Sequence, residues 1–358
     1  MKHLVVMAAG TGGHVIPGLA VAEEMQRRGW SVSWLGTYKG LENKLVPKAG
    51  IMLDRIAFTG LRGKGLFGNV LGALQLLVAF RTCTRLIQRR HADAVLGMGG
   101  YVCFPGGWMA WLLGKPVLLV NADASLLLSN RALLPAARRI AFGFPGRSAE
   151  AAGKKAVVTG NPVRAGIEEL PDPRQRFAGR TGSLRLLVVG GSLGARVLNE
   201  CVPRALAQML GTERPHVTHQ TGEANQAAVE TAYRVAGAKA EVLPFIDDIA
   251  WRLADCDVIV CRAGAITVSE LCAAGVPAVL VPLVVSTTSH QRDNAAWMAA
   301  QGAAIHLPQA ELTPERLADL LSTLTRESLL AMAIKARALA RPHAAARVAD
   351  EIESMVAA

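Results

Sequence analysis

The stretch Leu4-Val5-Val6-Met7-Ala8-Ala9-Gly10-Thr11-Gly12-Gly13-His14 passes from an apolar run into a cluster of glycines. A second stretch of this kind, Leu186-Leu187-Val188-Val189-Gly190-Gly191-Ser192-Leu193-Gly194-Ala195, opens the other half of the chain. The pattern indicates a strand, a tight glycine turn and a helix whose free N–H groups can hold an anion. Two copies predict twin α/β domains that face one another across a phosphate-bearing ligand.

The composition fits helices packed on parallel sheets. Of the 358 residues, 51% are hydrophobic but only 5% are aromatic, and the length suits about two domains. Six cysteines occur without a CxxC pair, which favours reduced thiols in a cytosolic protein. They are Cys83, Cys103, Cys201, Cys256, Cys261 and Cys272.

The net charge of +11 is unevenly distributed along the chain. Residues 1–163 carry 20 Lys and Arg against 7 Asp and Glu, whereas the remaining residues carry 19 against 21. A basic half can bind nucleic acid, but no DNA- or RNA-binding motif is recognisable, and few aromatic residues are present to stack on bases. We therefore expect no nucleic acid; an anionic membrane surface or a phosphorylated acceptor fits better.

Strand and helix patterns alternate along both halves. In the first half, strands are expected over residues 4–7, 31–35, 93–97 and 117–120, with a helix over 17–28. In the second half, strands are expected over 184–189, 216–221, 241–243, 258–261 and 278–281, with helices over 197–209, 224–236 and 266–274. This alternation predicts an α/β fold with parallel sheets and right-handed crossovers.

The domain boundary is expected near Gly160-Asn161-Pro162. We therefore predict a first domain over residues 1–163 and a second over residues 164–340. The alanine-rich tail is interrupted at Pro342, so a helix over about residues 341–358 is expected to pack back on the first domain.

The segment from Gly63 to Arg90 combines an apolar stripe with a basic face. The stripe comprises Val70, Leu71, Leu74, Leu77 and Val78, and the basic face comprises Arg81, Arg85 and Arg89. Such a stripe is more often a core contact than a membrane contact, but the basic clustering supports docking on anionic lipid, so we expect the first domain to dock on the membrane. The run from Val70 to Phe80 is 11 residues long, and a membrane-spanning helix needs about 20, so we expect no spanning helix.

The first glycine motif matches neither common nucleotide-binding fingerprint. Val15 stands where a third glycine would be needed, the next strand ends Trp34-Leu35-Gly36 without an acidic residue, and no GxxxxGK[ST] occurs. What remains is an anion-binding turn with His14 at its tip. Because α/β proteins bind ligands at this end of a strand, we predict that His14 is a general base rather than an ordinary polar residue.

The segment Cys261-Arg262-Ala263-Gly264-Ala265-Ile266-Thr267-Val268-Ser269-Glu270 predicts a strand, a turn at Gly264 and a helix. The first N–H groups of this helix can take a diphosphate. Glu270 can hold the paired hydroxyls of a ribose or, alternatively, complement the helix dipole. Arg164 is a candidate clamp on the same diphosphate. Asp255-Cys256-Asp257 resembles a metal-binding DxD, but we expect it to lead into a strand and predict no metal site.

Six motifs, taken in order, are similar to those of the MurG family, the N-acetylglucosaminyltransferases that convert lipid I to lipid II in peptidoglycan synthesis. The resemblance covers essentially the whole chain. The motifs are Gly10-Thr11-Gly12-Gly13-His14 with Pro17-Gly18, Gly97-Met98-Gly99-Gly100-Tyr101, Gly160-Asn161-Pro162-Val163-Arg164, Gly190-Gly191-Ser192 with Gly194-Ala195-Arg196, Arg262-Ala263-Gly264 with Thr267-Val268-Ser269-Glu270, and His290-Gln291 with Asn294-Ala295.

The resemblance implies a glycosyltransferase B fold, with two Rossmann-like domains around a deep cleft. It implies that the second domain binds UDP-N-acetylglucosamine and that the first binds undecaprenyl-diphosphate-linked N-acetylmuramoyl-pentapeptide. It also implies a peripheral location on the cytoplasmic side of the cell inner membrane. No cofactor is implied, and other cell-wall synthesis or division proteins remain an open class of partner.

The resemblance also implies roles for individual residues. Glu270 would hold the ribose hydroxyls, the backbone of Ile246 the uracil, and Gln291 the sugar. The predicted donor-binding residues are Thr11, Gly12, Gly13, Asp123, Arg164, Ser192, Ile246, Ala265, Ile266, Thr267, Val268, Ser269, Glu270 and Gln291. The predicted acceptor-binding residues are Gly12, Gly13, His14, Gly99, Gly100 and Tyr101, and the catalytic candidates are His14 and Asp123.

Two positions depart from the pattern of the family. Asp123, within Val120-Asn121-Ala122-Asp123, stands where the family commonly has asparagine, and Leu193 stands where glutamine is frequent. Asn121 and Asp123 are therefore alternatives for one sugar contact.

We predict a metal-independent inverting transfer in which His14 or Asp123 takes the proton of the acceptor's 4-hydroxyl. The alternatives are another enzyme of this fold, such as a glycolipid glycosyltransferase or a UDP-sugar epimerase, or a non-catalytic protein that binds a UDP-sugar at the membrane.

Overall fold

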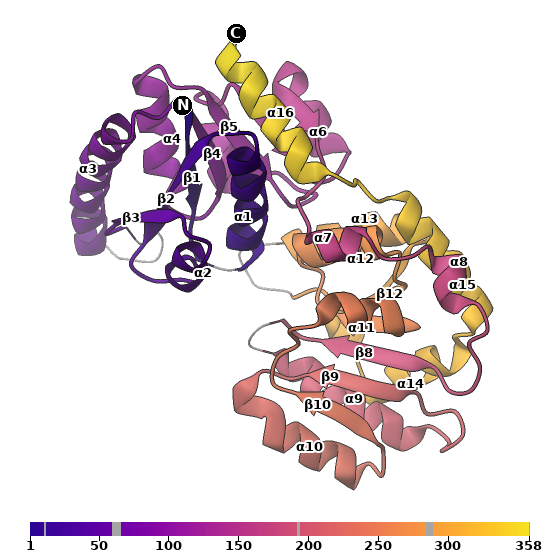
Figure 1. Ribbon diagram of the computed structural model, residues 1–358. Coiled ribbons are helices and arrows are strands. Elements are labelled where there is room, and N and C mark those ends of the chain that lie inside the picture. Colours follow the sequence, from indigo (N-terminus) through magenta and orange to yellow (C-terminus); the bar gives the residue numbers. More distant parts are fainter. Residues whose placement is uncertain (11, 59–65, 192–193, 284–288, 358) are drawn as a thin grey trace. The chain divides into compact units, whose positions relative to one another are not determined.

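The computed structural model describes residues 1–10, 12–58, 66–191, 194–283 and 289–357 (Figure 1). This part of the chain forms two compact units. Unit 1 comprises Met1–Val163 with His343–Ala358, and unit 2 comprises Arg164–Pro342. By sequence, unit 1 carries 21 Lys and Arg against 10 Asp and Glu, whereas unit 2 carries 18 of each. The whole net charge of the chain therefore belongs to unit 1.

Unit 1 contains a seven-stranded parallel sheet with the order β3-β2-β1-β4-β5-β6-β7. The strand order reverses at β1, so the segments that follow β1 and β4 leave the sheet side by side. The strands are β1 (His3–Ala8), β2 (Ser31–Thr37), β3 (Met52–Ile56), β4 (Ala94–Gly99), β5 (Val117–Asn121), β6 (Arg139–Phe142) and β7 (Ala156–Val158). Ligands of open parallel sheets bind at such a reversal.

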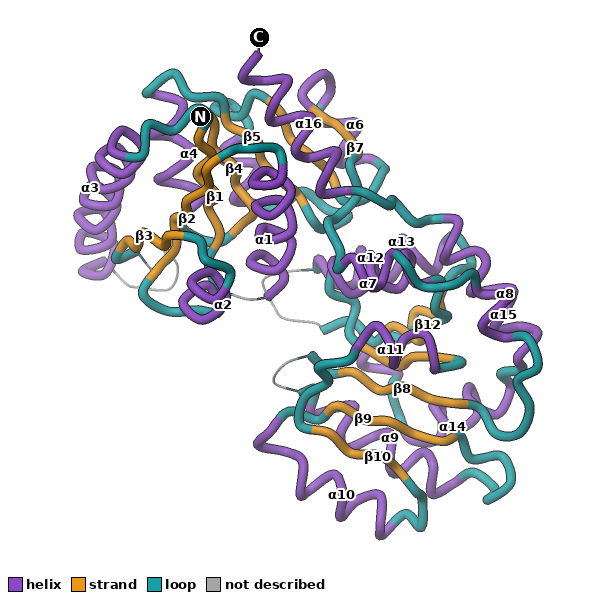
Figure 2. Tube along the Cα trace, viewed as in Figure 1, coloured by secondary structure: helices purple, strands orange, loops and turns teal. Residues whose placement is uncertain are grey.

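The helices of unit 1 cover both faces of this sheet, with α1 and α16 on one face and α3 and α4 on the other (Figure 2). They are α1 (Gly12–Arg27), α2 (Glu42–Lys48), α3 (Leu66–Arg89), α4 (Cys103–Leu112), α5 (Leu128–Leu133), α6 (Arg147–Ala151) and α16 (Ala344–Ala357). The expected start of α1 at Pro17 is wrong, because the helix begins at Gly12. Proline removes only one backbone hydrogen bond near this end, and His14 consequently lies inside the first helical turn.

Unit 2 contains a six-stranded parallel sheet with the order β10-β9-β8-β11-β12-β13. Its strands are β8 (Arg185–Val189), β9 (His216–Gln220), β10 (Ala240–Leu243), β11 (Val258–Cys261), β12 (Ala278–Leu280) and β13 (Ala304–His306). Its helices are α7 (Ala165–Glu168), α8 (Pro173–Phe177), α9 (Arg196–Gln208), α10 (Gln226–Val235), α11 (Ile249–Asp255), α12 (Ala265–Ala274), α13 (His290–Ala300), α14 (Pro314–Thr323) and α15 (Arg326–Ala338). The order reverses at β8, as it does at β1. The expected α/β class with two parallel sheets is confirmed.

The central strand β1 separates two apolar cores. Leu4 and Val6 pack with α1 and α16 on one face, whereas Val5 and Met7 pack with α3 and α4 on the other. This is the alternation of a strand with period two, and both faces are buried because helices cover both. Each such side chain contributes roughly 1.5–3 kcal/mol by its burial, so the glycines that follow β1 extend from a rigid strand.

The C-terminal helix α16 packs on α1 through apolar and charged contacts. Val348 and Ile352 are fully buried in the core beside α1. Arg28 donates to Asp350 and Glu353 at 2.7 Å each, and Nε1 of Trp30 donates to Glu353 at 3.1 Å. The end of the chain therefore completes the core of unit 1 rather than that of unit 2.

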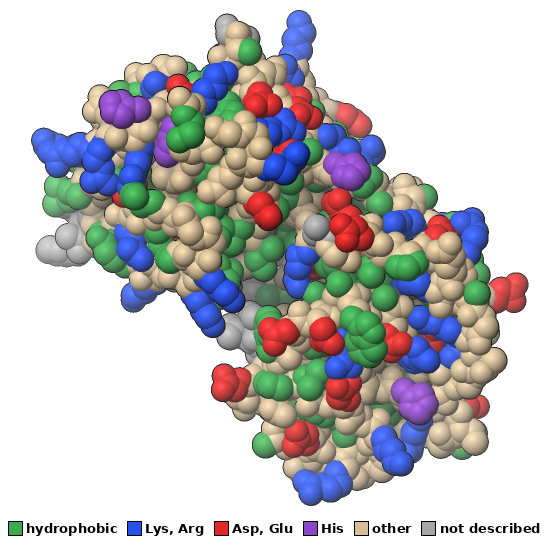
Figure 3. Space-filling view, in the orientation of Figure 1, with side chains coloured by type: hydrophobic (Ala, Val, Ile, Leu, Met, Phe, Trp, Pro, Cys, Tyr) green, Lys and Arg blue, Asp and Glu red, His purple; other side chains and the backbone are tan. Residues whose placement is uncertain are grey.

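The three described side chains of the apolar stripe of α3 do not lie in the core. Leu74, Leu77 and Val78 are 56%, 60% and 61% exposed, so the prediction of core contact is wrong for these three. The side chains of Val70 and Leu71 lie outside the described residues. The basic side chains of the same helix are also exposed, and Lys and Arg side chains gather beside hydrophobic ones in the region of α3 (Figure 3). No helix in the described part of the chain is long and apolar enough to cross a membrane.

Candidate active site

His14 packs against the glycine turn that follows β4. A Cβ atom at Gly99 would lie 2.5 Å from Cδ2 and 2.7 Å from Nε2 of His14, and the φ angle of Gly99 is +125°. Both the backbone conformation and the imidazole therefore exclude a side chain at this position. The adjacency of β1 and β4 explains why the predicted acceptor residues His14, Gly99 and Gly100 come together.

The imidazole of His14 is held in its neutral form. Burial lowers its pKa below the ordinary value, and a hydrogen bond with the backbone of Ala9 and the charge of Asp123 act in the opposite direction. Its Nδ1 atom is buried and has no hydrogen-bond partner among the described residues. A neutral imidazole can accept a proton, as a general base requires.

A buried asparagine shapes the loop that carries Asp123. The side-chain amide of Asn121 donates to the carbonyl oxygens of Asp123 and Ser125 at 2.8 and 3.1 Å. Its Oδ1 accepts from the backbone N–H of Leu127 and from the side chain of Asn130. Because Asn121 is fully buried in these contacts, Asp123 is the member of this pair that remains a candidate for substrate contact.

The other predicted residues of unit 1 differ in exposure. Gly13 is exposed, Gly12 is half-buried, and Tyr101 is 57% exposed after the turn that holds Gly99 and Gly100. Thr11 lies outside the described residues. These positions leave the start of α1 and the turn after β4 accessible on one edge of the sheet.

In unit 2, α12 begins at Ala265 directly after Gly264. Gly264 occupies the N-cap position without a side chain to cap the helix. The first N–H groups of the helix therefore lack the side-chain partner that Ser, Thr, Asp or Asn would supply there. These N–H groups belong to the predicted diphosphate segment, residues 265–269, and can donate to an anion.

Glu270 is buried on α12 and faces Arg164. Its side chain is 9% exposed, and Oε1 lies 3.1 Å from Nε of Arg164, although the two atoms are not aligned for a hydrogen bond. Burial raises the pKa of Glu270, and the charge of Arg164 acts against that rise. The predicted ribose ligand and the predicted phosphate clamp are thus brought together as an ion pair.

Two further predicted residues lie at the ends of other elements of unit 2. Ile246 follows β10 and is only 3% exposed, whereas the adjacent Phe245 is 53% exposed. Gln291 lies in the first turn of α13, where its Oε1 accepts from the backbone N–H of Leu283 at 2.8 Å. On the same helix, buried Asn294 donates to the carbonyl of Ala263 at 3.1 Å. The contact of Asn294 holds the backbone just before α12, and that of Gln291 holds the backbone after β12.

The second glycine loop, residues 190–195, is supported from the neighbouring strand. The amide of Gln220, the last residue of β9, donates to the carbonyl of Gly191 at 3.0 Å. Buried Asn199 donates to the carbonyl of Thr221 at 3.1 Å. Ser192 and Leu193 lie outside the described residues. Exposed Arg196 opens α9 and pairs with Glu200 at 2.6 Å.

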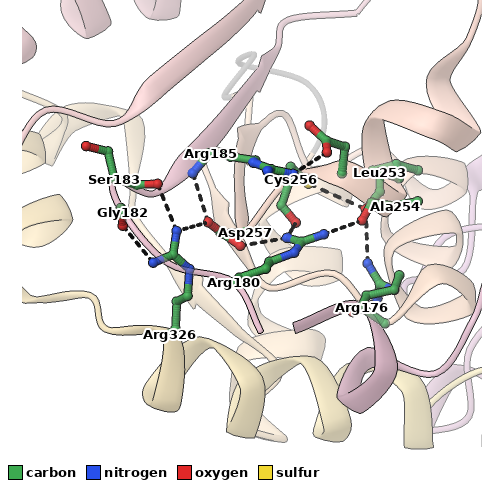
Figure 4. Close-up of polar contacts among 12 residues, drawn as sticks. Arg176, Arg180, Gly182, Ser183, Arg185, Leu253, Ala254, Cys256, Asp257 and Arg326 are labelled. Atoms are coloured by element: carbon green, nitrogen blue, oxygen red, sulfur yellow. Dashed lines mark hydrogen bonds and ion pairs between the residues drawn. The ribbon is translucent and has the colours of Figure 1, made fainter. Parts of the chain in front are cut away.

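The DxD-like segment serves as a structural junction (Figure 4). Asp257 is fully buried; its Oδ1 accepts from Arg180 at 2.6 Å, and its Oδ2 accepts from the backbone N–H of Arg185 and from Arg326. Asp255 pairs with the side chain of Arg185. Among the described residues, no three His, Cys, Asp or Glu side chains are grouped to hold a metal ion. The six cysteines are buried and unpaired.

The amide side chains that shape these loops were not identified from the sequence. Each donates to a backbone carbonyl between 10 and 39 positions away in sequence; these residues are Asn130, Asn161, Asn199 and Gln220. Asn161 and Gln220 lie at or after strand ends, and Asn130 and Asn199 lie on helices, places that many other residues share.

Two family profiles match the chain. The glycosyltransferase family 28 N-terminal domain matches residues 4–142, and the glycosyltransferase family 28 C-terminal domain matches residues 185–351. Together they cover most of both units.

Relatives of known name match over nearly the whole chain. The UDP-N-acetylglucosamine--N-acetylmuramyl-(pentapeptide) pyrophosphoryl-undecaprenol N-acetylglucosamine transferase of Methylibium petroleiphilum is 68% identical over 99% of this chain and 98% of its own length. The protein of the same name from Chromobacterium violaceum is 64% identical over 98% of this chain and 97% of its own.

Solved structures give the same result. The crystal structure of Acinetobacter baumannii MurG is 39% identical, with a TM-score of 0.85 over 99% of this chain and 100% of that one. A UDP-GlcNAc 2-epimerase from Neisseria meningitidis has a TM-score of 0.67 over 99% of this chain and 100% of that one, with 14% identity. At this identity the second likeness concerns the fold alone.

Proposed function

Since this chain belongs to the MurG family of glycosyltransferases, we propose that it transfers N-acetylglucosamine from UDP-N-acetylglucosamine to the 4-hydroxyl of lipid-linked N-acetylmuramoyl-pentapeptide. This reaction converts lipid I to lipid II in peptidoglycan synthesis. The observation that carries the proposal is the 68% identity with a named transferase over 99% of the chain. Support comes from the glycine loops, which lie where each strand order reverses.

Unit 2 binds the donor in this proposal. The backbone at Ile246 holds the uracil, Glu270 accepts hydrogen bonds from the ribose hydroxyls, and Gln291 contacts the sugar. The uncapped N–H groups at the start of α12 and the guanidinium of Arg164 hold the diphosphate. Arg164 and Glu270 form an ion pair, which brings the proposed phosphate and ribose ligands side by side.

Unit 1 binds the acceptor through the start of α1 and the turn after β4. The acceptor's 4-hydroxyl oxygen attacks the anomeric carbon as the bond from that carbon to UDP breaks, which inverts the configuration. The proton of the hydroxyl passes to neutral His14, and the carboxylate of Asp123 stabilises the imidazolium that forms. UDP leaves as an anion, stabilised by the N–H groups of α12 and by Arg164.

We further propose that unit 1 docks on the anionic cytoplasmic surface of the cell inner membrane. The exposed apolar residues of α3, together with Trp111 and Leu112 at 48% and 64% exposed on α4, supply apolar contact. The net positive charge of unit 1 supplies attraction to anionic lipid.

Vesicle sedimentation tests this docking. Binding is expected to increase with phosphatidylglycerol content, to weaken with salt, and to fall in Leu77→Glu. Leu210→Glu, at a position 68% exposed in unit 2, is the matched control and should bind as the unaltered chain does. Equal loss in both variants would contradict docking through α3.

Release of UDP from UDP-N-acetylglucosamine in the presence of lipid I tests the proposed reaction. Release that needs both substrates, with a disaccharide product, is expected, and UDP-glucose and an acceptor-free reaction are the controls. Epimerisation of the donor without acceptor would instead indicate an epimerase. Donor binding without release, with lipid I and with a panel of other glycolipids, would indicate a non-catalytic protein.

A further inference from the structure

We propose that Glu42 is a positioning residue that holds Gly10, where the chain leaves β1 for α1, in the place that lets the first glycine loop receive the acceptor diphosphate. The inference rests on the proposed function, which assigns Gly12, Gly13 and His14 of this loop to the acceptor. Glu42 does not touch substrate in this account and acts through Gly10.

The carboxylate of Glu42 joins two neighbouring strands at their carboxyl ends. Glu42 is the first residue of α2 and is fully buried. Its Oε2 accepts from the backbone N–H of Gly10 at 3.0 Å, directly after β1. Its Oε1 accepts from the backbone N–H of Thr37 at 3.1 Å and lies 2.8 Å from the Thr37 hydroxyl, at the end of β2.

The chain around this carboxylate is shaped to fit Gly10. The N–H of Leu41 donates to the carbonyl of Gly10 at 3.0 Å, so both backbone polar groups of Gly10 are taken up by residues 41 and 42. Gly40 has a φ angle of +128°, and a Cβ atom there would overlap Oε2 of Glu42 and lie 3.0 Å from the Cα of Gly10. Residues 40–42 therefore fix the direction in which the chain leaves β1.

The carboxylate that supports the loop has no positively charged partner. No Lys, Arg or His of the described residues forms an ion pair with Glu42; its partners there are the N–H groups of Gly10 and Thr37 and the Thr37 hydroxyl. Burial of such a carboxylate costs stability unless its hydrogen bonds are strong. Bonds to an ionised acceptor are about twice as strong as neutral ones, which suits a loop that must keep one shape.

The negative charge of Glu42 lets an experiment distinguish a positioning role from a purely electrostatic effect on acceptor binding. A negative charge behind a loop that receives a diphosphate disfavours the anion, so its removal alone would strengthen acceptor binding. A positioning role gives the opposite result. In Glu42→Gln, one side-chain N–H group would face the N–H of Gly10 or of Thr37, and two donors cannot share a hydrogen bond.

Steady-state kinetics of Glu42→Gln with lipid I and UDP-N-acetylglucosamine test the proposal. We expect the KM for lipid I to rise roughly 10- to 100-fold, the scale of effect that a small misplacement of a binding group produces. The donor KM should rise less than the lipid I KM, because Ile246, Glu270 and Arg164, the predicted ligands of the UDP moiety, lie in unit 2, whereas Gly12 and Gly13 of unit 1 are predicted to contact both substrates. Melting temperatures are measured in parallel.

Asp54→Asn is the matched control. Asp54 is a partly buried carboxylate of the same unit that pairs with Arg89 and Arg90 at 2.8 Å each. The same carboxylate-to-amide change there should lower stability but leave the lipid I KM unchanged. Thr37→Val, which removes the hydroxyl that lies 2.8 Å from Oε1 of Glu42 and 2.6 Å from the carbonyl of Lys39, should raise the lipid I KM roughly 10-fold, as loss of one hydrogen bond to a charged group does.

An unchanged or lower lipid I KM in Glu42→Gln, with the unaltered chain active, overturns this inference and leaves the proposed function intact. Equal rises in Glu42→Gln and Asp54→Asn also overturn it, because the effect then follows stability. If Glu42→Gln does not fold, Thr37→Val decides: an unchanged lipid I KM overturns the inference. Inactivity of the unaltered chain on lipid I overturns the proposed function and this inference with it.

Discussion

The two glycine loops occupy equivalent places in their sheets, yet groups of opposite kind support them. In unit 1 the carboxylate of Glu42 accepts from the N–H of Gly10, whereas in unit 2 the amide of Gln220 donates to the carbonyl of Gly191. Glu42 begins α2, the helix that follows the neighbouring strand β2, and Gln220 ends the neighbouring strand β9. The fold therefore determines where each glycine loop is supported. The type of supporting side chain, carboxylate or amide, determines whether a backbone N–H or a backbone carbonyl of the loop is used for that support.

Burial acts on a titratable residue in each site, and it shifts the two pKa values in opposite directions. Burial lowers the pKa of His14 and raises that of Glu270, since burial disfavours the charged form of each. In unit 1 the result is a neutral base. In unit 2, Arg164 opposes the effect of burial and favours a charged carboxylate. Unit 1 is thus suited to proton transfer and unit 2 to holding a ligand.

Loss of the base is the largest effect that we expect. His14→Ala should lower kcat by roughly 100- to 10,000-fold, the usual contribution of a general base, because no group would take the proton of the acceptor hydroxyl. Single-turnover and steady-state rates measure the loss. Turnover near that of the unaltered chain would refute the role of His14.

The pH profile of the unaltered chain is a second readout of the same base. Because His14 must be neutral to act and burial lowers its pKa, kcat/KM should fall with acid only below the ordinary histidine value of 6.5. The charge of Asp123 raises the pKa of His14, so Asp123→Asn should move this acid limb to lower pH.

The ion pair of unit 2 should give the next largest effect. Arg164→Gln should weaken donor binding roughly 10- to 100-fold, as loss of a charged hydrogen bond does. Without Arg164 the pKa of Glu270 rises further, so donor affinity should be lost at a higher pH as acid is added. Calorimetric titration of the donor between pH 5 and 8 measures both. An unmoved pH dependence would show that Arg164 does not act on Glu270.

The support of the second loop should have a smaller effect. Gln220→Leu removes one neutral hydrogen bond to Gly191, so the donor KM should rise about 3- to 10-fold. The lipid I KM should stay unchanged, in contrast to Glu42→Gln. If both variants raised the same KM, the assignment of one loop to each substrate would be wrong.

A buried histidine of unit 2 should affect stability and leave activity unchanged. Burial lowers the pKa of His219 to about 3, and its Nδ1 lies 2.8 Å from the hydroxyl of Tyr233. The unfolded chain binds this proton near pH 6.5 while the folded chain does not. The free energy of unfolding should therefore fall by about 2 kcal/mol between pH 7 and pH 5 from this residue.

His219→Gln keeps a polar partner for Tyr233 but does not titrate. UDP should raise the melting temperature of unit 2, which identifies the calorimetric transition of that unit. In His219→Gln, the melting temperature of this transition should depend less on pH. Activity at pH 7 is the control and should not change. A pH dependence equal to that of the unaltered chain would show that other groups govern acid unfolding.

The strands and loops that could be predicted from the sequence are those with continuous apolar runs and glycines. β1, β8 and β11 are buried on both faces, so their residues are almost uniformly apolar. β3, β6, β7 and β13 were missed. β3 and β7 lie at the sheet edges, are largely half-exposed or exposed and carry no such run, whereas β6 and β13 are only four and three residues long. Periodicity also placed the stripe of α3 on one face without indicating whether another element covers that face.

Within the site, the sequence was informative about backbone turns and about His14 and Glu270, whose residue types suggest chemistry. It was uninformative about their partners. The pairing of Arg164 with Glu270 joins residues 106 positions apart in sequence, and that of Glu42 with Gly10 joins residues 32 apart. Such contacts depend on the order of strands in a sheet, which the spacing of motifs along the chain does not reveal.

Calorimetric titration of UDP into His14→Ala and Glu270→Ala tests the division between the two units most directly. The account predicts that His14→Ala, which is nearly inactive, binds UDP with the affinity of the unaltered chain. Glu270→Ala should bind UDP roughly 10- to 100-fold more weakly, because the ribose loses a charged hydrogen-bond acceptor. Loss of UDP affinity in His14→Ala, or full affinity in Glu270→Ala, would contradict the assignment of the donor to unit 2.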